Sequence, residues 1–140
     1  MDSKELLKAT DLLLEISSLL MVSGANTIRV NLTIDRFADC LNLKSSSFIS
    51  HKSIVMTLYK EDSNESCTRV KNIPNQAIDF NIISAISKVS WDTLNHNWTI
   101  EQIADEIHKI NKKKDIRNYL CLLPLVWQVL DSAIFLKVTI

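Results

Sequence analysis

The spacing of hydrophobic residues predicts two helices at the start of the chain. Over Glu5–Val22, leucines and isoleucines recur at helical spacing, and charged residues occupy the remaining arc. Gly24 follows directly, and glycine readily adopts the left-handed conformation that ends many helices. A second helix is expected to begin near Asn26 or Thr27, because either side chain can cap it. Its apolar face consists of Val30, Ile34, Phe37, Ala38 and Leu41. The short link between the two helices predicts a helical hairpin.

The hydrophobic period changes from helical to alternating between residues 45 and 71. Apolar side chains occupy every second position over residues 53–59, which predicts a strand with one buried face. Residues 46–50 are interpreted as a strand before it. The polar residues 60–65 are typical of a hairpin connection, and the chain is expected to return as a third strand over residues 67–71. These segments predict a small three-stranded antiparallel sheet.

A second helical hairpin is predicted after the sheet. Pro74 marks the exit from the last strand, and Asp79 or the residue before it opens a helix. One side of this helix carries Phe80, Ile83, Ser87, Ser90, Trp91 and Leu94, with Ile82, Ile86 and Val89 adjacent. Thr99 and Gln102 have the spacing of a capping box and precede isoleucines at helical spacing. The expected order is ααβββαα, an α+β fold.

The end of the chain has the pattern of the beginning of a membrane helix. Five basic residues lie just ahead of the apolar residues 119–127, as on the cytoplasmic side of a transmembrane helix. These basic residues are Lys109, Lys112, Lys113, Lys114 and Arg117. A membrane span needs about 20 mostly apolar residues, but Gln128, Asp131 and Lys137 interrupt the segment. We therefore expect an α+β domain over residues 1–115 and the start of a membrane helix over residues 116–140.

Several motifs in one order resemble a known family. They are Ser23–Val30, the strand Ser53–Tyr59, the return Thr68–Val70 and the helix Asp79–Trp91. Together they resemble the N-terminal domain of the threonine/serine exporter family, over about residues 12–125. In that family a hydrophilic domain precedes a bundle of transmembrane helices, and a two-subunit branch is associated with succinate export. The resemblance implies a role in amino-acid or dicarboxylate export and no enzymatic turnover.

The resemblance also implies a cellular location and partners for the chain. It places residues 1–115 on the cytoplasmic side of the inner membrane. The expected partner is the remainder of the transporter or a second membrane subunit, and assembly with further copies of the chain is left open. No nucleic-acid partner is expected, because Lys plus Arg and Asp plus Glu both total 16 and leave no net charge.

The last residues depart from the family pattern. Residues 126–140 do not match the first membrane helix of related sequences, whereas back-translation of Leu125–Ile140 in another frame gives a string that does. We expect a frameshift near Leu125 and a truncated exporter domain that does not transport by itself, which the coding DNA read in all frames would check. The alternative is a stand-alone soluble regulatory or ligand-binding domain, with the tail folded back as a core helix.

Composition and motifs exclude several kinds of active site. A single glycine rules out a glycine-rich phosphate loop. Three cysteines without a C-x-x-C pair favour a reducing compartment and indicate neither a disulfide framework nor a zinc knuckle. The histidines at 51, 96 and 108 have no partner at metal-ligand spacing, and no G-x-S-x-G motif is present. We therefore predict no catalytic residues, no metal site and no cofactor.

Two residues remain as candidates for substrate contacts. Arg29 could bind a carboxylate of a substrate or a neighbouring subunit through its planar fork, and Ser23 lies beside Gly24 in the same motif. The structural interpretation of this motif, in which Gly24 ends one helix and lets the next fold back, is favoured. Ser84, Ser87 and Ser90 share one helix face near Trp91, where they allow close packing or, alternatively, line a hydroxyl-bearing surface.

Overall fold

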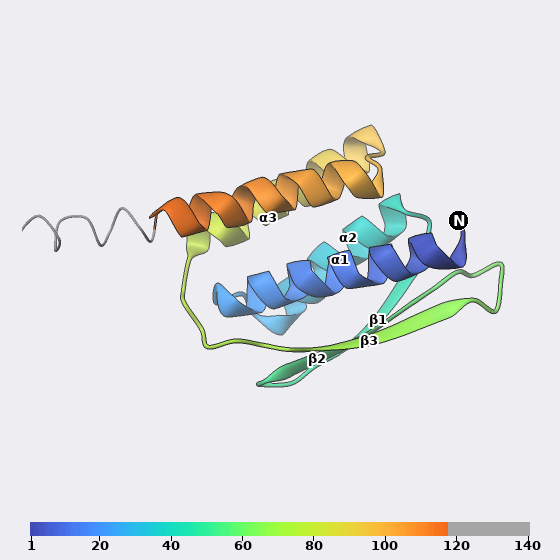
Figure 1. The fold of residues 1–140 in the computed structure, drawn as a ribbon, viewed down its shortest axis with the longest axis horizontal. Coiled ribbons are helices and arrows are strands. Elements are labelled where there is room, and N and C mark those ends of the chain that lie inside the picture. The colour runs from blue at the N-terminus through green and yellow to red at the C-terminus, as the bar shows by residue number, and fades with distance from the viewer. Residues whose placement is uncertain (118–140) are drawn as a thin grey trace, which may run out of the picture.

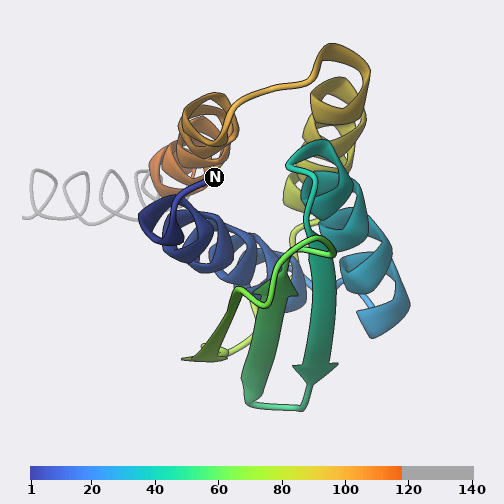
Figure 2. The same ribbon diagram turned by 90° about the vertical axis from the view of Figure 1, so that its right-hand side faces the viewer.

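The computed structural model describes residues 1–117, which form three layers (Figures 1 and 2). The elements are α1 (Ser3–Val22), α2 (Thr27–Cys40), β1 (Lys44–Ile49), β2 (Ser53–Tyr59), β3 (Ser66–Asn72) and α3 (Phe80–His96). A further helix covers residues 100–117. The sheet forms the first layer, α1 and α2 the second, and α3 with helix 100–117 the third (Figure 2). This architecture confirms the predicted α+β fold and its ααβββαα order.

Each helix of the first hairpin begins at a capping residue. A capping box formed by Asp2 and Glu5 opens α1, which starts at Ser3, two residues before the predicted start. Asn26 opens α2, and its side chain accepts a hydrogen bond from the backbone N–H of Arg29 at 2.8 Å. The predicted cap of the second helix is therefore confirmed.

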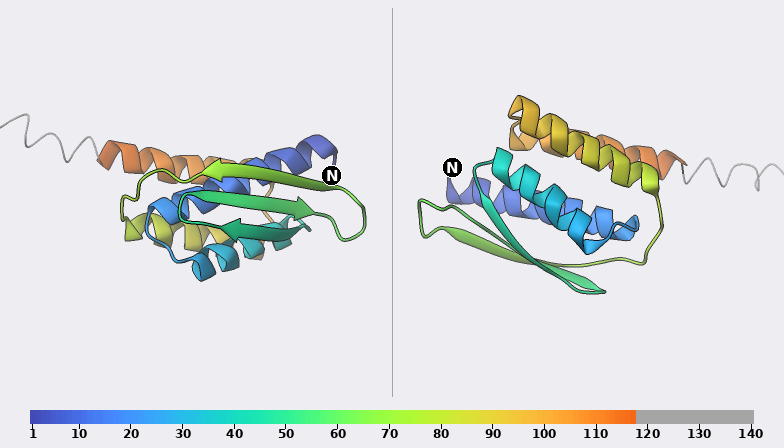
Figure 3. Two further views of the ribbon diagram at one scale, coloured as in Figure 1. Left: turned by 90° about the horizontal axis from the view of Figure 1, so that it is seen from below. Right: turned by 180° about the vertical axis from the view of Figure 1, so that it is seen from behind.

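The sheet has the order β1-β2-β3 and is antiparallel throughout. Ile54, Met56 and Leu58 of β2 are fully buried against the helices, as the alternating pattern predicted. The register places Phe48, Val55 and Val70 in one row across the other face. No helix of residues 1–117 covers that face (Figure 3), so Phe48 is 70% exposed and Val70 64% exposed.

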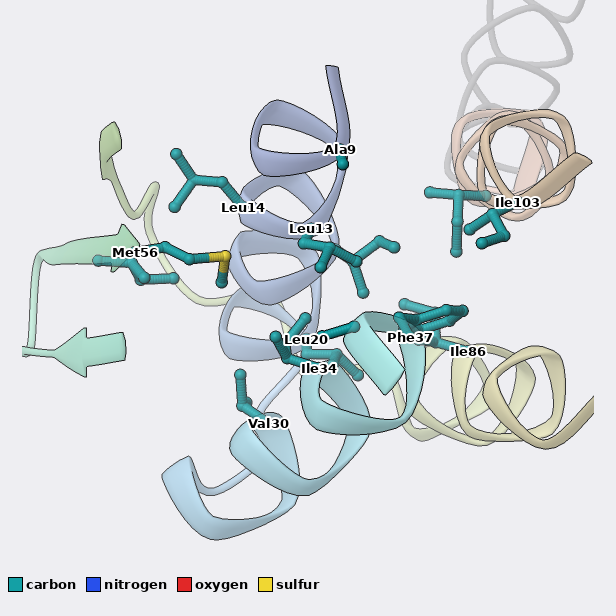
Figure 4. Close-up of a cluster of buried hydrophobic side chains, with 14 of the residues drawn as sticks. Ala9, Leu13, Leu14, Leu20, Val30, Ile34, Phe37, Met56, Ile86 and Ile103 are labelled. Carbon is teal, nitrogen blue, oxygen red and sulfur yellow. The ribbon is translucent and has the colours of Figure 1, made fainter. Parts of the chain in front are cut away.

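Helix α1 lies at the centre of the hydrophobic core. It packs against β2 and β3 on one side and against α2 on another, and its Leu13 points toward Phe37, Ile86 and Ile103 (Figure 4). Helix 100–117 covers α1 from the side opposite the sheet (Figure 2). The core is therefore continuous through all three layers, which explains why α1 is apolar over most of its circumference.

Helix α3 buries a face that carries three isoleucines, whereas two of its aromatic side chains lie outside that face. Ile82, Ile86 and Val89 are buried, whereas Phe80 is 72% exposed and Trp91 50% exposed. Among residues 1–117, no helix is both long enough and apolar enough to cross a membrane. The predicted membrane segment over residues 116–140 lies, apart from its first two residues, outside the described residues.

Candidate functional site

Ser23 lies in the turn that ends α1, and this turn has the geometry expected from Gly24. Gly24 adopts a φ of +97°, and its N–H donates to the carbonyl of Met21. The N–H of Ala25 reaches back to the carbonyl of Leu20 at 3.0 Å. These two bonds form the Schellman arrangement, which satisfies the last carbonyls of a helix. The favoured structural interpretation of the Ser23-Gly24 motif is thus confirmed.

The segment between β3 and α3 crosses this turn. The N–H of Ala77 donates to the carbonyl of Val22 at 2.9 Å, and the N–H of Asp79 donates to the carbonyl of Ser23 at 3.0 Å. Ser23 is completely buried beneath the crossing, and its hydroxyl has no hydrogen-bond partner within residues 1–117. Leaving a buried hydroxyl unpaired costs about 1 to 3 kcal/mol. The unpaired hydroxyl of Ser23 is therefore expected to destabilise the fold.

Asp79 joins this crossing to the end of the described chain. Its carboxylate accepts a hydrogen bond from the N–H of Asn81 at 3.1 Å and so caps α3. The same carboxylate forms an ion pair with the guanidinium of Arg117. Ser23, Asp79 and Arg117 thereby connect the α1–α2 turn, the segment before α3 and the end of helix 100–117. We call these three residues the junction.

A pocket of about 400 Å³ lies beside the junction, between α1, the residues after β3 and helix 100–117. Val22 and Ala77, whose backbones bond to each other at the crossing, form part of its wall. Its polar lining comes from Glu15, Ser18, Lys71, Asn75, Asn111 and Lys114. The polar groups therefore come from three separate stretches of the sequence, residues 15–18, 71–75 and 111–114, which is why no sequence motif indicated the pocket.

Arg29, the second candidate, lies apart from Ser23. It is exposed in the first turn of α2, and its guanidinium has no hydrogen bond or ion pair to residues 1–117. The side chain of Ser23 is buried, so the two candidates do not form a common binding site. Whether Arg29 contacts a substrate or a subunit stays a prediction.

The serine face of α3 packs against α2. Ser90 is buried and donates to the carbonyl of Ser87 at 2.7 Å, while Nη1 of Arg36 donates to the Ser90 hydroxyl at 3.3 Å. Ser84, in contrast, is exposed. The packing interpretation thus holds for Ser90. Sequence reasoning missed Arg36, although its spacing of seven residues from Arg29 places both on one flank of α2.

The described residues contain no group of histidine, cysteine or carboxylate side chains that could hold a metal ion. Cys40 instead serves the packing of α2 on α3, because its thiol donates to the carbonyls of Thr93 at 3.3 Å and Trp98 at 3.6 Å. Burial raises the pKa of this thiol above its ordinary value. The thiol is therefore protonated at neutral pH and is a poor nucleophile.

The fold and the junction together define a small α+β domain whose last described helix leads into an apolar segment. Comparison with known proteins identifies the family. Residues 11–136 match the ThrE family model, described as "Putative threonine/serine exporter", and the chain belongs to this family of membrane-transport proteins. No curated protein and no solved structure gave a significant match. The family resemblance expected from the sequence is confirmed.

Proposed function

We propose that residues 1–115 form the cytoplasmic domain of an exporter of small amino acids or dicarboxylates, and that residues 116–140 begin a membrane helix. The family match supports this proposal because it extends from residue 11 to residue 136 and so includes both segments. The basic residues of 109–117 precede the apolar residues 119–127, the order found on the cytoplasmic side of membrane helices.

The ion pair between Asp79 and Arg117 is the observation that carries the proposal. Arg117 lies two residues before the apolar stretch, and Asp79 bonds through its backbone to the α1–α2 turn. A displacement of the membrane segment would therefore act directly on the junction. In this proposal the domain gates or assembles the transporter, while the transport path is formed by further membrane segments or by a second subunit.

An export assay tests the transport part of the proposal. The 140-residue chain is expressed alone in cells that lack threonine and serine export, and efflux of both amino acids is measured after loading with dipeptides. We expect no restored efflux from this chain and restored efflux once a membrane subunit of the same transporter is supplied. Efflux restored by the 140-residue chain alone would show that the chain forms its own path.

Cysteine labelling tests the side of the membrane. Ser63 lies in the exposed turn between β2 and β3, so a Ser63→Cys variant presents a thiol to solvent. A membrane-impermeant maleimide should label this variant only after the cells are opened, and the unsubstituted chain gives the background from its own cysteines. Labelling of Ser63→Cys in intact cells at the rate seen in opened cells would place the domain outside.

A further inference from the structure

Exposed hydrophobic side chains gather at the end of the molecule where the described residues stop. They come from the first turn of α2, the residues around the start of α3 and the end of helix 100–117, which lie at one end of the molecule (Figure 1). The ion pair between Asp79 and Arg117 joins the last two of these segments. The hydrophobic side chains are 52% to 72% exposed, and they are Ile28, Ile78, Phe80 and Ile116.

Charge is also divided between the two ends of the molecule, although the whole chain has no net charge. Residues 101–106 of the last described helix include three acidic side chains and no basic one, whereas residues 107–117 include five basic side chains and one acidic one. The turn at residues 60–65 lies at the same end as the start of this helix (Figure 1) and carries three acidic side chains and one basic one. The hydrophobic end is therefore also the positively charged end.

The helix dipole alone does not explain this division of charge. The dipole favours acidic side chains at the start of a helix and basic ones at its end, but it acts only within the first and last turns. Lys112 lies before the last turn of helix 100–117. Arg29 is exposed in the first turn of α2, where the dipole favours a negative charge and no acidic side chain is present. A negatively charged surface facing this end of the molecule would stabilise both side chains.

The sequence places the apolar stretch 119–127 two residues after Arg117. Two residues span at most about 7 Å, and the headgroup layer on each side of the hydrocarbon core is about 5 to 8 Å thick. When residue 119 enters the hydrocarbon core, as the proposed function requires, Arg117 lies in the headgroup layer. The ion pair with Arg117 places Asp79 there too, together with its neighbours Ile78 and Phe80.

We propose that this end of the domain rests on an anionic lipid bilayer through a membrane-facing surface formed by Ile28, Arg29, Ile78, Phe80 and Lys113. The three hydrophobic side chains enter the boundary between headgroups and acyl chains, as the apolar side of an interfacial segment does. Arg29 and Lys113, both exposed, bind lipid phosphate groups. A bilayer is favoured over a protein partner because these side chains come from three elements that meet where the apolar stretch begins. The proposal rests on the proposed function.

NMR relaxation of the backbone amides tests the membrane-facing surface. The full 140-residue chain is reconstituted in nanodiscs of phosphatidylcholine and phosphatidylglycerol, in which a few lipid headgroups carry gadolinium. The amides of residues 28, 78 and 80 should relax about tenfold faster than those of residues 60–65, because the effect falls steeply with distance and α3 alone is about 25 Å long. In discs of phosphatidylcholine alone this difference should shrink, since each basic residue facing anionic lipid contributes a preference of about fivefold.

Two double variants separate the hydrophobic and the electrostatic contributions. Ile78→Ser/Phe80→Ser should remove most of the difference in relaxation between the two ends, because no large side chain of this segment enters the acyl boundary. Leu94→Ser is the matched control, since Leu94 is an exposed hydrophobic residue in the last turn of the same helix, and it should keep the full difference. Arg29→Gln/Lys113→Gln should reduce the difference as much as removal of phosphatidylglycerol does, whereas Lys60→Gln should leave it unchanged.

Three results would overturn the membrane-facing surface. One is relaxation at residues 60–65, or at Phe48 and Val70 on the open sheet face, that equals relaxation at residues 28, 78 and 80. This result is expected if a protein subunit covers the surface instead of lipid. Another is an unchanged profile in Ile78→Ser/Phe80→Ser while circular dichroism shows a folded protein. The third is a chain that does not co-purify with the nanodiscs, which would contradict the proposed membrane helix as well. Even relaxation in a chain that does co-purify contradicts the surface alone.

Discussion

The guanidinium of Arg36 lies over the ring of Trp91, 4.1 Å from the ring centroid, and so joins α2 to α3. Trp91 is half exposed, and a cation over an aromatic face at such a site contributes about 0.5 to 1 kcal/mol. The contact also holds Nη1 of Arg36 within 3.3 Å of the Ser90 hydroxyl. Arg36 thus donates a hydrogen bond to the buried Ser90 hydroxyl and also lies over the exposed indole of Trp91.

Replacing Arg36 is therefore expected to weaken the α2–α3 contact. Arg36→Met keeps the apolar stem and removes the charge, which should cost about 1 kcal/mol of unfolding free energy, measured by urea denaturation. Arg36→Lys keeps the charge and should lose less unfolding free energy than Arg36→Met. A double-mutant cycle with Trp91→Leu isolates the pair. Strict additivity of Arg36→Met and Trp91→Leu would show that the two side chains do not interact in solution.

The two roles of Asp79 can be separated by substitution. Asp79→Asn retains a capping side chain and loses the ion pair with Arg117, whereas Asp79→Ala loses both. We expect Asp79→Ala to be less stable than Asp79→Asn by about 1 kcal/mol, the usual value of a helix N-cap. Arg117→Gln should match Asp79→Asn in thermal unfolding. If Arg117→Gln has no effect at low salt while Asp79→Asn destabilises, the ion pair contributes nothing.

Gly24 is expected to tolerate a side chain poorly because of its backbone and not because of crowding. A Cβ at this position would lie 3.5 Å from Cγ1 of Ile78, an ordinary contact. Its φ of +97°, however, is one that residues with a Cβ rarely adopt. Gly24→Ala should therefore cost about 1 to 2 kcal/mol in denaturant unfolding. Gly24→Asn should cost less, and an Ala variant as stable as the unsubstituted chain would mean that the turn opens in solution.

The ion pair between Asp11 and Arg69 gives a pH dependence of defined sign. The hydrogen bond from Arg69 lowers the pKa of Asp11, and the nearby charges of Arg69 and Lys71 act in the same direction, while burial opposes them. A carboxyl with a lowered pKa stabilises the fold above its unfolded pKa of about 3.9, and this contribution is lost as the pH falls through the folded value. Both side chains are about half exposed, so the effect should stay below about 1 kcal/mol.

An NMR titration of the Asp11 carboxyl measures this directly. In Arg69→Gln its pKa should rise from the lowered value, and stability at neutral pH should fall slightly. Arg29→Gln is the control, because Arg29 contacts no carboxylate among residues 1–117. An unchanged Asp11 pKa in Arg69→Gln would contradict the ion pair.

Local signals were enough to predict most of the fold. The Asn26 cap, Gly24 and the alternation over β2 each act within a few residues, so they are visible in the sequence. The buried face of α3 was harder to predict from the sequence, because apolar residues occur around most of this helix. Whether Phe80 or Ile82 is buried depends on which layer lies beneath the helix.

The candidate site could not be predicted from local signals in the sequence, because its residues come together only in the tertiary structure. Ser18, Lys71 and Lys114 are more than forty residues apart along the chain and come together only because α1 lies between the sheet and helix 100–117. Arg29 and Ser23, in contrast, are close in sequence but differ in burial. The closeness of Ser23 and Arg29 in the sequence therefore suggested a shared motif, whereas the structure shows that Ser23 belongs to the turn that ends α1. The same closeness gave no indication of the pocket.

The central position of α1 has a consequence for synthesis. Its first partner, α2, follows directly, but its cover on the far side includes Ile103, which lies 81 residues after Val22. At translation rates of about 5 to 20 residues per second, α1 waits about 4 to 16 s after its own completion before that cover has been made. During this interval an apolar helix surface is exposed beside the ribosome, so the nascent chain should be a client of chaperones until helix 100–117 emerges.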